Sequence, residues 1–308
     1  MGATVIDGNA VAEQLRAEIE EELRVLRLSA VRPGLATVMV GESFDAQAYE
    51  KHVRRLAEGL EYRYVSERLS ADAELADVVA TIGKMNADPR VTGVLVLQPL
   101  PEHVPEAAVN SALEPTKDIE AVHPLNAGLL AQGQPRFLPS TPASCFYLLD
   151  SYVTSQGHDA STYYSGRTLV VVGRSNSVGK PVQWLGLERN MTVITAHSRT
   201  AAAGRLGDFT RQADVLIVAA GKPGLVTGEM VRDGVIAIDV GINAVKDAST
   251  GKTRMVGDLE FDGVAVRAEA ITPVPGGVGP ITDVWLVGNA FAAAAMAQRV
   301  EPRFGLFR

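Results

Sequence analysis

Residues 168–181, TLVVVGRSNSVGKP, decide the fold. The valine-rich segment 168–172 predicts a buried strand, and the glycine that follows it opens a turn into a helix. This order suits a dinucleotide-binding turn, which needs little side-chain bulk and a helix N-terminus directed at the pyrophosphate. Serine stands at the second glycine position of the common G-x-G-x-x-G motif, so an ordinary strand–helix turn remains the alternative. The residues of this loop that we expect at a cofactor are Gly173, Arg174, Ser175, Val178 and Gly179.

The end of the next predicted strand indicates which dinucleotide would bind. NAD sites usually place Asp or Glu there to hold the ribose 2′-hydroxyl. Here the strand 192–196 runs into HSRT (197–200), which contains no acid. Arg174 and Arg199, together with Ser198, could bind a 2′-phosphate, because planar guanidinium groups bind phosphate well. The sequence therefore favours NADP over NAD, with a solvated surface role for Arg199 as the alternative.

Glycines also close the third and fourth predicted strands of this unit. The segments AAGKPG (219–224) and DVGIN (239–243) place a glycine at a carboxyl end, where backbone can approach a cofactor closely. Turn formation alone would explain the same glycines. The further cofactor contacts that we expect are His197, Ser198, Arg199, Ala220, Gly221, Gly241, Ile242 and Thr282.

Helix and strand patterns alternate along most of the chain, which predicts an α/β fold with parallel sheets. In the second half, predicted strands lie at 168–172, 192–196, 215–219 and 235–239. In the first half, helices are predicted at 11–28, 45–60 and 73–86, and strands at 36–40, 64–69 and 93–97. A proline-rich connection spans 113–142, a helix covers about 142–154, and a last helix at about 282–299 is predicted to return to the first unit.

Length and composition support two domains and exclude several classes of protein. The chain has 308 residues, about two domains at ~150 residues each. It carries 29 Lys and Arg against 36 Asp and Glu, a net charge of −7, without a basic run. We therefore expect no nucleic-acid partner. The single cysteine, Cys145, excludes an intrachain disulfide, and the five histidines show no metal-binding spacing, so we expect no metal.

The N-terminal sequence MGATVIDGNAVAEQL lacks the basic and apolar regions of a signal peptide. No apolar run approaches the ~20 residues of a membrane span, and the small-residue stretch 291–297 is too short. The sequence therefore predicts a soluble, cytoplasmic protein that does not bind a membrane.

Motifs spread along nearly the whole chain are shared with one known family. They are IDG (6–8), VG (40–41) with Gln47 and Tyr49, PLP (99–101), KD (117–118), HPLN (123–126), TP (141–142), GRSNSVGKP (173–181), HSRT (197–200), GKPG (221–224), DVGIN (239–243), VGD (256–258) and TPVPGGVGP (272–280). On these residues the chain resembles the methylenetetrahydrofolate dehydrogenase/cyclohydrolase family of the FolD type. The last motif is long and specific.

The resemblance implies a homodimer whose protomer has a catalytic domain, a Rossmann-like NADP domain and the substrate in the cleft between them. Residues 1–141 and 281–308 would form the catalytic, folate-binding domain, and residues 142–280 the NADP-binding domain. Such enzymes oxidise 5,10-methylenetetrahydrofolate to the 5,10-methenyl cation with NADP and then hydrolyse it to 10-formyltetrahydrofolate. The implied substrate contacts are Tyr49, Gln98, Pro99, Leu100, Glu120, Pro275, Gly276 and Gly277.

Three positions depart from the family pattern. The family places a Lys four residues after the Tyr, and here Val53 stands there; Lys51 would lie roughly 200° round the helix. Leu97 stands at the position of the family Gln, and the neighbouring Gln98 would point away from the site unless a bulge re-aims it. Glu120 replaces the family Asp with a side chain that is one methylene longer.

These departures affect the two activities differently. Hydride transfer requires the methylene carbon to be held against the nicotinamide, and no protein base must move a proton. Hydrolysis requires proton transfer, for which a Lys bonded to Tyr and Gln is suited. We therefore predict a dehydrogenase with weak or absent cyclohydrolase activity. His52, three residues after Tyr49 on the same helix face, is the candidate substitute base, with a partly exposed histidine of no function as the alternative.

Two other readings remain open. A repurposed paralogue would act on a different substrate or folate adduct, which changes at Val53, Leu97 and Glu120 would fit. Asp283 is a candidate fourth change, although an acid in the first turns of a helix is also ordinary. A non-catalytic folate- or NADP-binding protein is the third reading, and the intact loop 272–280 argues against it.

Overall fold

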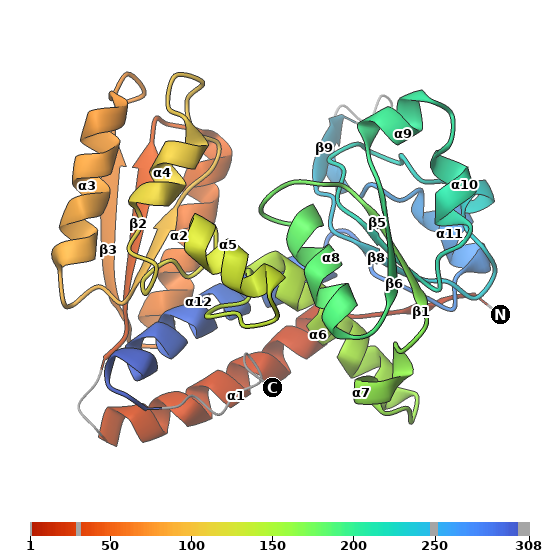
Figure 1. Ribbon diagram of the computed structural model, residues 1–308, viewed down its shortest axis with the longest axis horizontal. Coiled ribbons are helices and arrows are strands. Elements are labelled where there is room, and N and C mark those ends of the chain that lie inside the picture. Colours follow the sequence, from red (N-terminus) through yellow and green to blue (C-terminus); the bar gives the residue numbers. More distant parts are fainter. Residues whose placement is uncertain (1, 29–31, 247–251, 301–308) are drawn as a thin grey trace. The chain divides into compact units, whose positions relative to one another are not determined.

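The computed structural model describes residues 2–28, 32–246 and 252–300. The chain divides into two compact units, each built from two stretches of sequence (Figure 1). Unit 1 comprises Met1–Glu13 and Thr141–Thr282, and unit 2 comprises Gln14–Ser140 and Asp283–Arg308. The α/β class with two domains, predicted from the alternation of helices and strands, is confirmed.

Unit 1 contains a six-stranded parallel sheet in the order β1-β11-β8-β7-β5-β6. Its strands are β1 (Thr4–Val5), β5 (Thr168–Val172), β6 (Thr192–Ala196), β7 (Val215–Val218), β8 (Ile236–Asp239) and β11 (Ala270–Ile271). The chain leaves strand β5 toward β6 on one side and then crosses to β7 on the other. This reversal creates the topological switch point at which doubly wound sheets bind ligands.

The predicted strands at 168–172 and 192–196 have these same bounds in the structure. Strands β7 and β8 are buried along their whole length, as a central parallel sheet requires. The other elements of the unit are α6 (Ser140–Ser155), α7 (Ala160–Tyr163), α8 (Gly179–Glu188), α9 (Ser198–Ala202), α10 (Leu206–Thr210), η1 (Gly228–Met230), β9 (Asn243–Lys246), β10 (Thr253–Val256) and α11 (Phe261–Arg267). Helix α8 lies against β5 and β6, and β9 and β10 form an antiparallel hairpin.

The first residues of the chain lie in unit 1, whereas the expected boundaries place them with residues 14–141. Strand β1 pairs in parallel with β11, with Thr4 opposite Ala270 and Val5 opposite Ile271. A two-residue strand has no periodicity to detect, and its partner is more than 260 residues away in sequence. Local pattern therefore gives no signal for this pairing.

Unit 2 contains a three-stranded parallel sheet, β3-β2-β4, with β2 (Gly34–Val40) in the centre between β3 (Arg63–Leu69) and β4 (Gly93–Val96). Its helices are α1 (Gly8–Leu28, from Gln14 onward), α2 (Phe44–Gly59), α3 (Leu75–Ala87), α4 (Glu106–Ala112), α5 (Pro124–Ala131) and α12 (Val278–Ala297, from Asp283 onward). All residues of β2 are buried, and alternate ones serve opposite faces. Ala36 and Val38 belong to the core that includes Ile82 of α3, while Thr37 bonds Tyr64 on the other face.

Helix α12 completes unit 2 after leaving unit 1, as the predicted return of the last helix requires. The buried Asn289 amide donates hydrogen bonds to the carbonyls of Ile119 (2.7 Å) and Leu138 (2.8 Å). Among the described residues, α12 is the helix that is long and apolar enough to cross a membrane by length and composition alone. Of its apolar window, 78% is buried inside the protein, as in the core helix of a globular fold. Thr282, Asp283 and Asn289 interrupt the apolar residues of α12, so the sequence of this helix contains no unbroken apolar run of that length.

Candidate nucleotide site and acid–base cluster

The turn between β5 and α8 has no room for side chains at its two glycines. Gly173 has a φ of +140°, and a Cβ there would lie 2.3 Å from the carbonyl oxygen of Ala219. A Cβ on Gly179 would lie 2.5 Å from the carbonyl carbon and oxygen of Gly173. The Ser175 hydroxyl accepts hydrogen bonds from the backbone N–H groups of Val178 (3.1 Å) and Gly179 (3.2 Å). Serine at the second glycine position thus closes the turn through its hydroxyl group.

A cavity of about 590 Å³ opens at the carboxyl ends of β5, β6 and β7. It is lined by Val172, Gly173, Arg174, Ser175, His197, Ser198, Ala201, Ala202, Gly204, Leu206, Gly207, Ala219, Ala220, Lys222, Leu225 and Met230. The cavity has the size of a small-molecule site and lies at the switch point of the sheet. Its apolar wall, with cationic side chains at Arg174 and Lys222, fits an adenine nucleotide that carries phosphate groups.

Several of the expected cofactor residues of unit 1, among them Arg199, Ile242 and Thr282, do not line the cavity. Arg199 is exposed and stands outside the set of cavity-lining residues, and its N–H donates to Nδ1 of His197, which caps α9. Ile242 is exposed, and the Thr282 hydroxyl donates to the Val278 carbonyl of its own helix (3.2 Å). Gly221 adopts a φ of +63°, so its turn requires glycine independently of a ligand.

The buried Asp258 organises the loops beyond β7 and β8. Its carboxylate accepts hydrogen bonds from the backbone N–H groups of Ala220 (2.6 Å), Gly221 (2.8 Å) and Lys222 (2.7 Å). The Asn243 amide donates a further bond to it (2.9 Å). A Cβ on Gly241 would lie 2.2 Å from the Asp258 carboxylate carbon, so that glycine leaves room for this carboxylate.

A second buried carboxylate, Asp239 at the end of β8, lies beside it. It accepts from the N–H groups of Gly241 (3.0 Å), Asp258 (3.0 Å) and Leu259 (2.8 Å). Burial raises the pKa of Asp239 to about 6, against the lowering effect of these hydrogen bonds. The two carboxylates together hold the loops that border the cavity.

The loop 272–280 contacts the start of the chain within unit 1. The Gly8 N–H donates to the Gly276 carbonyl (2.9 Å), and a Cβ on Gly8 would lie 1.7 Å from the Gly277 carbonyl oxygen. Gly276 has a φ of +101°, and Pro275 is exposed. The IDG and TPVPGGVGP motifs therefore form one structural element, although about 265 residues of sequence separate them.

In unit 2, Tyr49 on α2 lies within electrostatic reach of two carboxylates. Burial, followed by the charges of Glu120 and Asp283, raises the pKa of the Tyr49 phenol well above its ordinary value. The Ser140 hydroxyl donates to Glu120 Oε2 (2.9 Å), and burial raises the pKa of Glu120 to about 7. The other oxygen, Oε1, is buried and has no hydrogen-bond partner among the described residues. The same side of α2 carries His52, whose Nε2 lies 2.9 Å from Asp283 Oδ2.

The two positions at which the resemblance predicts a Lys and a Gln are apolar and inaccessible. Val53 is 0% exposed and Leu97 is 2% exposed. The Leu97 N–H continues the ladder to the Val38 carbonyl (2.9 Å). Gln98 is exposed, and its Oε1 accepts a hydrogen bond from the Leu100 N–H (3.1 Å) across the exposed Pro99. The Gln98 amide is therefore engaged in its own turn.

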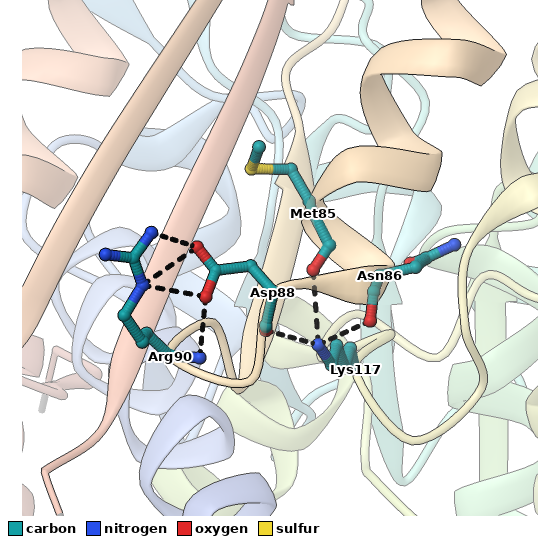
Figure 2. A network of polar contacts seen from close by, with 5 residues as sticks. All are labelled: Met85, Asn86, Asp88, Arg90 and Lys117. Carbon is teal, nitrogen blue, oxygen red and sulfur yellow. Dashed lines mark hydrogen bonds and ion pairs between the residues drawn. The ribbon is translucent and has the colours of Figure 1, made fainter.

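The side chain of Lys117, in the KD motif, caps the C-terminus of helix α3. Figure 2 shows its ammonium group among three backbone carbonyls, those of Met85 (3.1 Å), Asn86 (2.7 Å) and Asp88 (2.8 Å). Burial lowers the pKa of Lys117, against the charges of Asp88 and Glu114. A cation at the C-terminal carbonyls of a helix is favourable, so this lysine serves the fold.

Helix α2 is held to β3 by the buried Glu50, which lies between Tyr49 and His52 in the sequence of the helix. Glu50 accepts hydrogen bonds from Ser66 (2.5 Å), Arg68 (2.5 Å), Arg54 (3.3 Å) and Tyr64 (3.4 Å). Burial acts to raise the pKa of Glu50, but the bonds from Ser66 and Arg68 outweigh it, so that the pKa is lowered.

The Glu50→Gln variant is expected to be destabilised in a pH-dependent way. Because the folded-state pKa is lowered, the stabilisation is present above the ordinary Glu value and is lost as pH falls through the folded-state value. We expect a loss of about 2–3 kcal/mol in the free energy of unfolding near pH 7, since charge-assisted hydrogen bonds contribute about this much. Urea unfolding of both proteins between about pH 3 and pH 7 measures it. A difference that stays constant over this range would contradict the role of the carboxylate.

Sequence reasoning missed several residues of these sites. Lys222, Leu225 and Met230 line the cavity, and their position just after β7 was the available signal. Asp258 was quoted in a shared motif without a function, because the partners of a buried carboxylate cannot be recognised from spacing. In the part of the chain that the structure describes, no group of three or more His, Cys, Asp or Glu side chains could hold a metal ion.

The switch-point cavity and the glycine cradle define a dinucleotide-binding α/β protein. Comparison with known proteins specifies it further. The model of the tetrahydrofolate dehydrogenase/cyclohydrolase catalytic domain matches residues 6–120, and that of the NAD(P)-binding domain of the same family matches residues 139–298. The chain therefore belongs to the tetrahydrofolate dehydrogenase/cyclohydrolase family, and the family predicted from its motifs is confirmed.

Individual relatives are similar over nearly the whole chain. The "Bifunctional protein FolD 3" of Rubrobacter xylanophilus is 58% identical over 98% of this chain and 96% of its own. The "Bifunctional protein FolD" of Moorella thermoacetica is 42% identical, over 96% of this chain and 99% of its own. The structure of the Trypanosoma brucei methylenetetrahydrofolate dehydrogenase-cyclohydrolase, complexed with NADP cofactor and inhibitor, superimposes with a TM-score of 0.88 at 34% identity, over 97% of this chain and 100% of that one.

Proposed function

We propose that this protein is an NADP-dependent methylenetetrahydrofolate dehydrogenase whose cyclohydrolase activity is weak or absent. The observation that carries the proposal is the contrast between two sites. The nucleotide cradle is complete, with Gly173 and Gly179 at positions that admit no Cβ. The positions of the family Lys and Gln hold the buried apolar side chains Val53 and Leu97.

The residues of unit 1 fit a phosphorylated dinucleotide. The glycine turn leads into the N-terminus of the ten-residue helix α8, where backbone N–H groups bind pyrophosphate. Arg174 and Lys222 line the cavity, and no acid follows β6, which supports NADP over NAD. The bound dinucleotide would supply a hydride acceptor. The side chains of unit 1 would bind and orient it.

The residues of unit 2 fit the pterin of a folate. The unpartnered Glu120 Oε1 offers a hydrogen bond to a polar heterocycle. Because the pKa of Glu120 is raised to about 7, this oxygen can accept or donate near neutral pH. Its side chain is one methylene longer than that of Asp, so the pterin would bind farther from the backbone of residue 120.

Hydrolysis of the methenyl cation needs a group that accepts a proton from water. Neither Val53 nor Leu97 can do so, and the Gln98 amide bonds its own turn. Losing positioned acid–base groups typically removes about 10²–10⁴-fold in rate. Oxidation of the methylene group places no such demand on the protein.

The purified protein, mixed with NADP and 5,10-methylenetetrahydrofolate, is expected to form NADPH while the methenyl product accumulates. Absorbance of both products is followed together, with a reaction lacking NADP as the control. Rapid clearance of the methenyl signal would contradict the proposed loss of cyclohydrolase activity. Folate binding without either signal would indicate a non-catalytic protein.

A repurposed paralogue is the second candidate. The Asp-to-Glu change at position 120, next to the Tyr49 phenol, favours it, because it alters the pocket that would receive the pterin. An NADPH-coupled activity on another substrate, with none on methylenetetrahydrofolate, would support it. For both candidates the family resemblance implies a cytoplasmic homodimer. Sedimentation of the purified protein tests the expected dimer.

A further inference from the structure

His52 and Asp283 form a hydrogen-bonded pair between two helices of unit 2. His52 Nε2 on α2 lies 2.9 Å from Asp283 Oδ2 on α12. The imidazole side chain is 52% exposed, whereas the carboxylate side chain is 19% exposed. A covered carboxylate that bonds a more exposed imidazole orients the ring and leaves its other side toward solvent.

The pair belongs to a larger group of proton-carrying side chains. Tyr49 is one helical turn from His52 on α2, and its phenol is under the influence of both Asp283 and Glu120. Burial raises the pKa of Asp283 to about 6, against the lowering effect of His52. The charged groups that face this cluster come from α2, from α12 and from the segment that carries Glu120. On α2 itself, Arg55 is the charged residue one turn beyond His52.

We infer that this protein retains a weak methenyl hydrolysis, for which His52, positioned by Asp283, is the general base in place of the lysine that Val53 replaces. This inference rests on the proposed folate chemistry. It goes beyond it by assigning the residual hydrolysis to two residues, of which Asp283 acts through His52. His52 is the catalytic residue and Asp283 is a positioning residue.

The tautomer of the neutral ring follows from its hydrogen bond to Asp283. When Nε2–H donates to the Asp283 carboxylate, Nδ1 keeps the ring lone pair and can accept a proton. Water adds to the methenyl carbon as Nδ1 takes one of its protons; a C–O bond forms, and the C=N π bond breaks with its electron pair passing to the nitrogen. In the next step the hydroxyl group of this adduct loses its proton to solvent. The ring C–N bond breaks, and the nitrogen keeps the electron pair and receives the proton from the imidazolium. The balance is methenyl cation plus water giving 10-formyl product plus one proton.

His52 and the neighbouring Val53 differ in how far their side chains are exposed. Val53 lies one residue further along α2, and its apolar side chain is fully buried and has no group that could accept a proton. His52 is more exposed and already has a carboxylate partner. A base that reaches water from this side of the helix needs no rearrangement of the core.

The test uses preformed 5,10-methenyltetrahydrofolate, so that hydrolysis is measured without NADP. The His52→Ala variant is expected to lose about 10²-fold of the catalysed hydrolysis rate, or to fall to the spontaneous rate if that is reached first. Added imidazole is expected to restore part of this rate. Asp283→Asn is expected to lower kcat by at least about tenfold with little change in KM. The double variant should lose no more than His52→Ala alone, since Asp283 acts through His52.

Lys51→Gln is the matched control, because Lys51 is exposed on the same helix and lies roughly 200° round it from Tyr49. Dehydrogenase turnover of each variant with NADP shows that the protein is folded and binds folate. Unchanged hydrolysis in His52→Ala, failure of imidazole to rescue it, or an unmodified protein no faster than spontaneous hydrolysis would each overturn the inference. NADPH formation in those cases leaves the proposed dehydrogenase standing. Hydrolysis that depends on His52 without any NADPH formation would instead overturn the proposed dehydrogenase.

Discussion

The Gly179→Ala variant is expected to bind NADPH at least about a hundredfold more weakly than the unmodified protein. The added Cβ would lie 2.5 Å from the carbonyl carbon and oxygen of Gly173 and 2.6 Å from the Arg174 nitrogen. All three are backbone atoms, so the turn itself must move, and the N–H groups that would face the pyrophosphate move with it. A hundredfold loss corresponds to about 2.7 kcal/mol of binding free energy. Titration of protein fluorescence with NADPH measures it.

Gly83→Ala provides the matched control for this substitution. Gly83 lies inside helix α3, and its Cβ would meet no atom within 4 Å. Alanine there should leave NADPH affinity unchanged and raise the free energy of unfolding by up to about 1 kcal/mol, because alanine favours the helix. If Gly179→Ala binds NADPH as tightly as Gly83→Ala does, the turn after β5 is not the dinucleotide site.

The Asp258→Asn variant is expected to lose about 3–5 kcal/mol in the free energy of unfolding. The carboxylate accepts four hydrogen bonds, three of them from the successive N–H groups of residues 220–222. An amide group presents one oxygen and one NH₂, so buried donors would face a donor and remain unsatisfied. Breaking a buried charged network by removing one partner has this order of cost. Urea unfolding followed by circular dichroism measures it.

Asp262→Asn is the control for charge alone. Asp262 is exposed in the first turn of α11, where an acid contributes only about 0.3–1 kcal/mol through the helix dipole. A loss in Asp258→Asn no greater than that of Asp262→Asn would show that the loops after β7 and β8 do not depend on the buried carboxylate.

The elements predicted most accurately were those with strong local patterns. The valine-rich β5 and the strand β6 have the bounds that their sequences predict. Helix α1 ends at Leu28, as its apolar periodicity indicates, but it begins at Gly8, three residues before the first apolar residue of that pattern. The region 113–142 was interpreted as a connection, yet it contains α5 (Pro124–Ala131). Proline at the first position of a helix is favourable, so Pro124 begins that helix instead of breaking it.

Partnerships distant in sequence could not be predicted. The strands β1 and β11 have two residues each and are paired across almost the whole chain. Arg199 was expected to join Arg174 at a phosphate, whereas Lys222 stands with Arg174 in the cavity lining. Helix α9 begins at Ser198 and is capped by His197. Arg199 therefore lies on a helix, where successive side chains point in different directions. The functions of the cofactor and substrate residues remain predictions that the binding experiments test.

The division of each unit into two stretches of sequence has a consequence for biosynthesis. The β2 sheet of unit 2 is translated early, but the Asn289 amide that bonds the Ile119 and Leu138 carbonyls, and the Val287 carbonyl that accepts from Tyr62, are translated near the end. While the ribosome adds residues 141–282, Tyr62 and the carbonyls of Ile119 and Leu138 lack their partners on α12. Unit 2 therefore completes its core after unit 1, although its strands β2, β3 and β4 are translated before strands β5 to β8 of unit 1. Nascent chains halted before residue 283 should be more sensitive to protease in residues 14–140 than in residues 141–282.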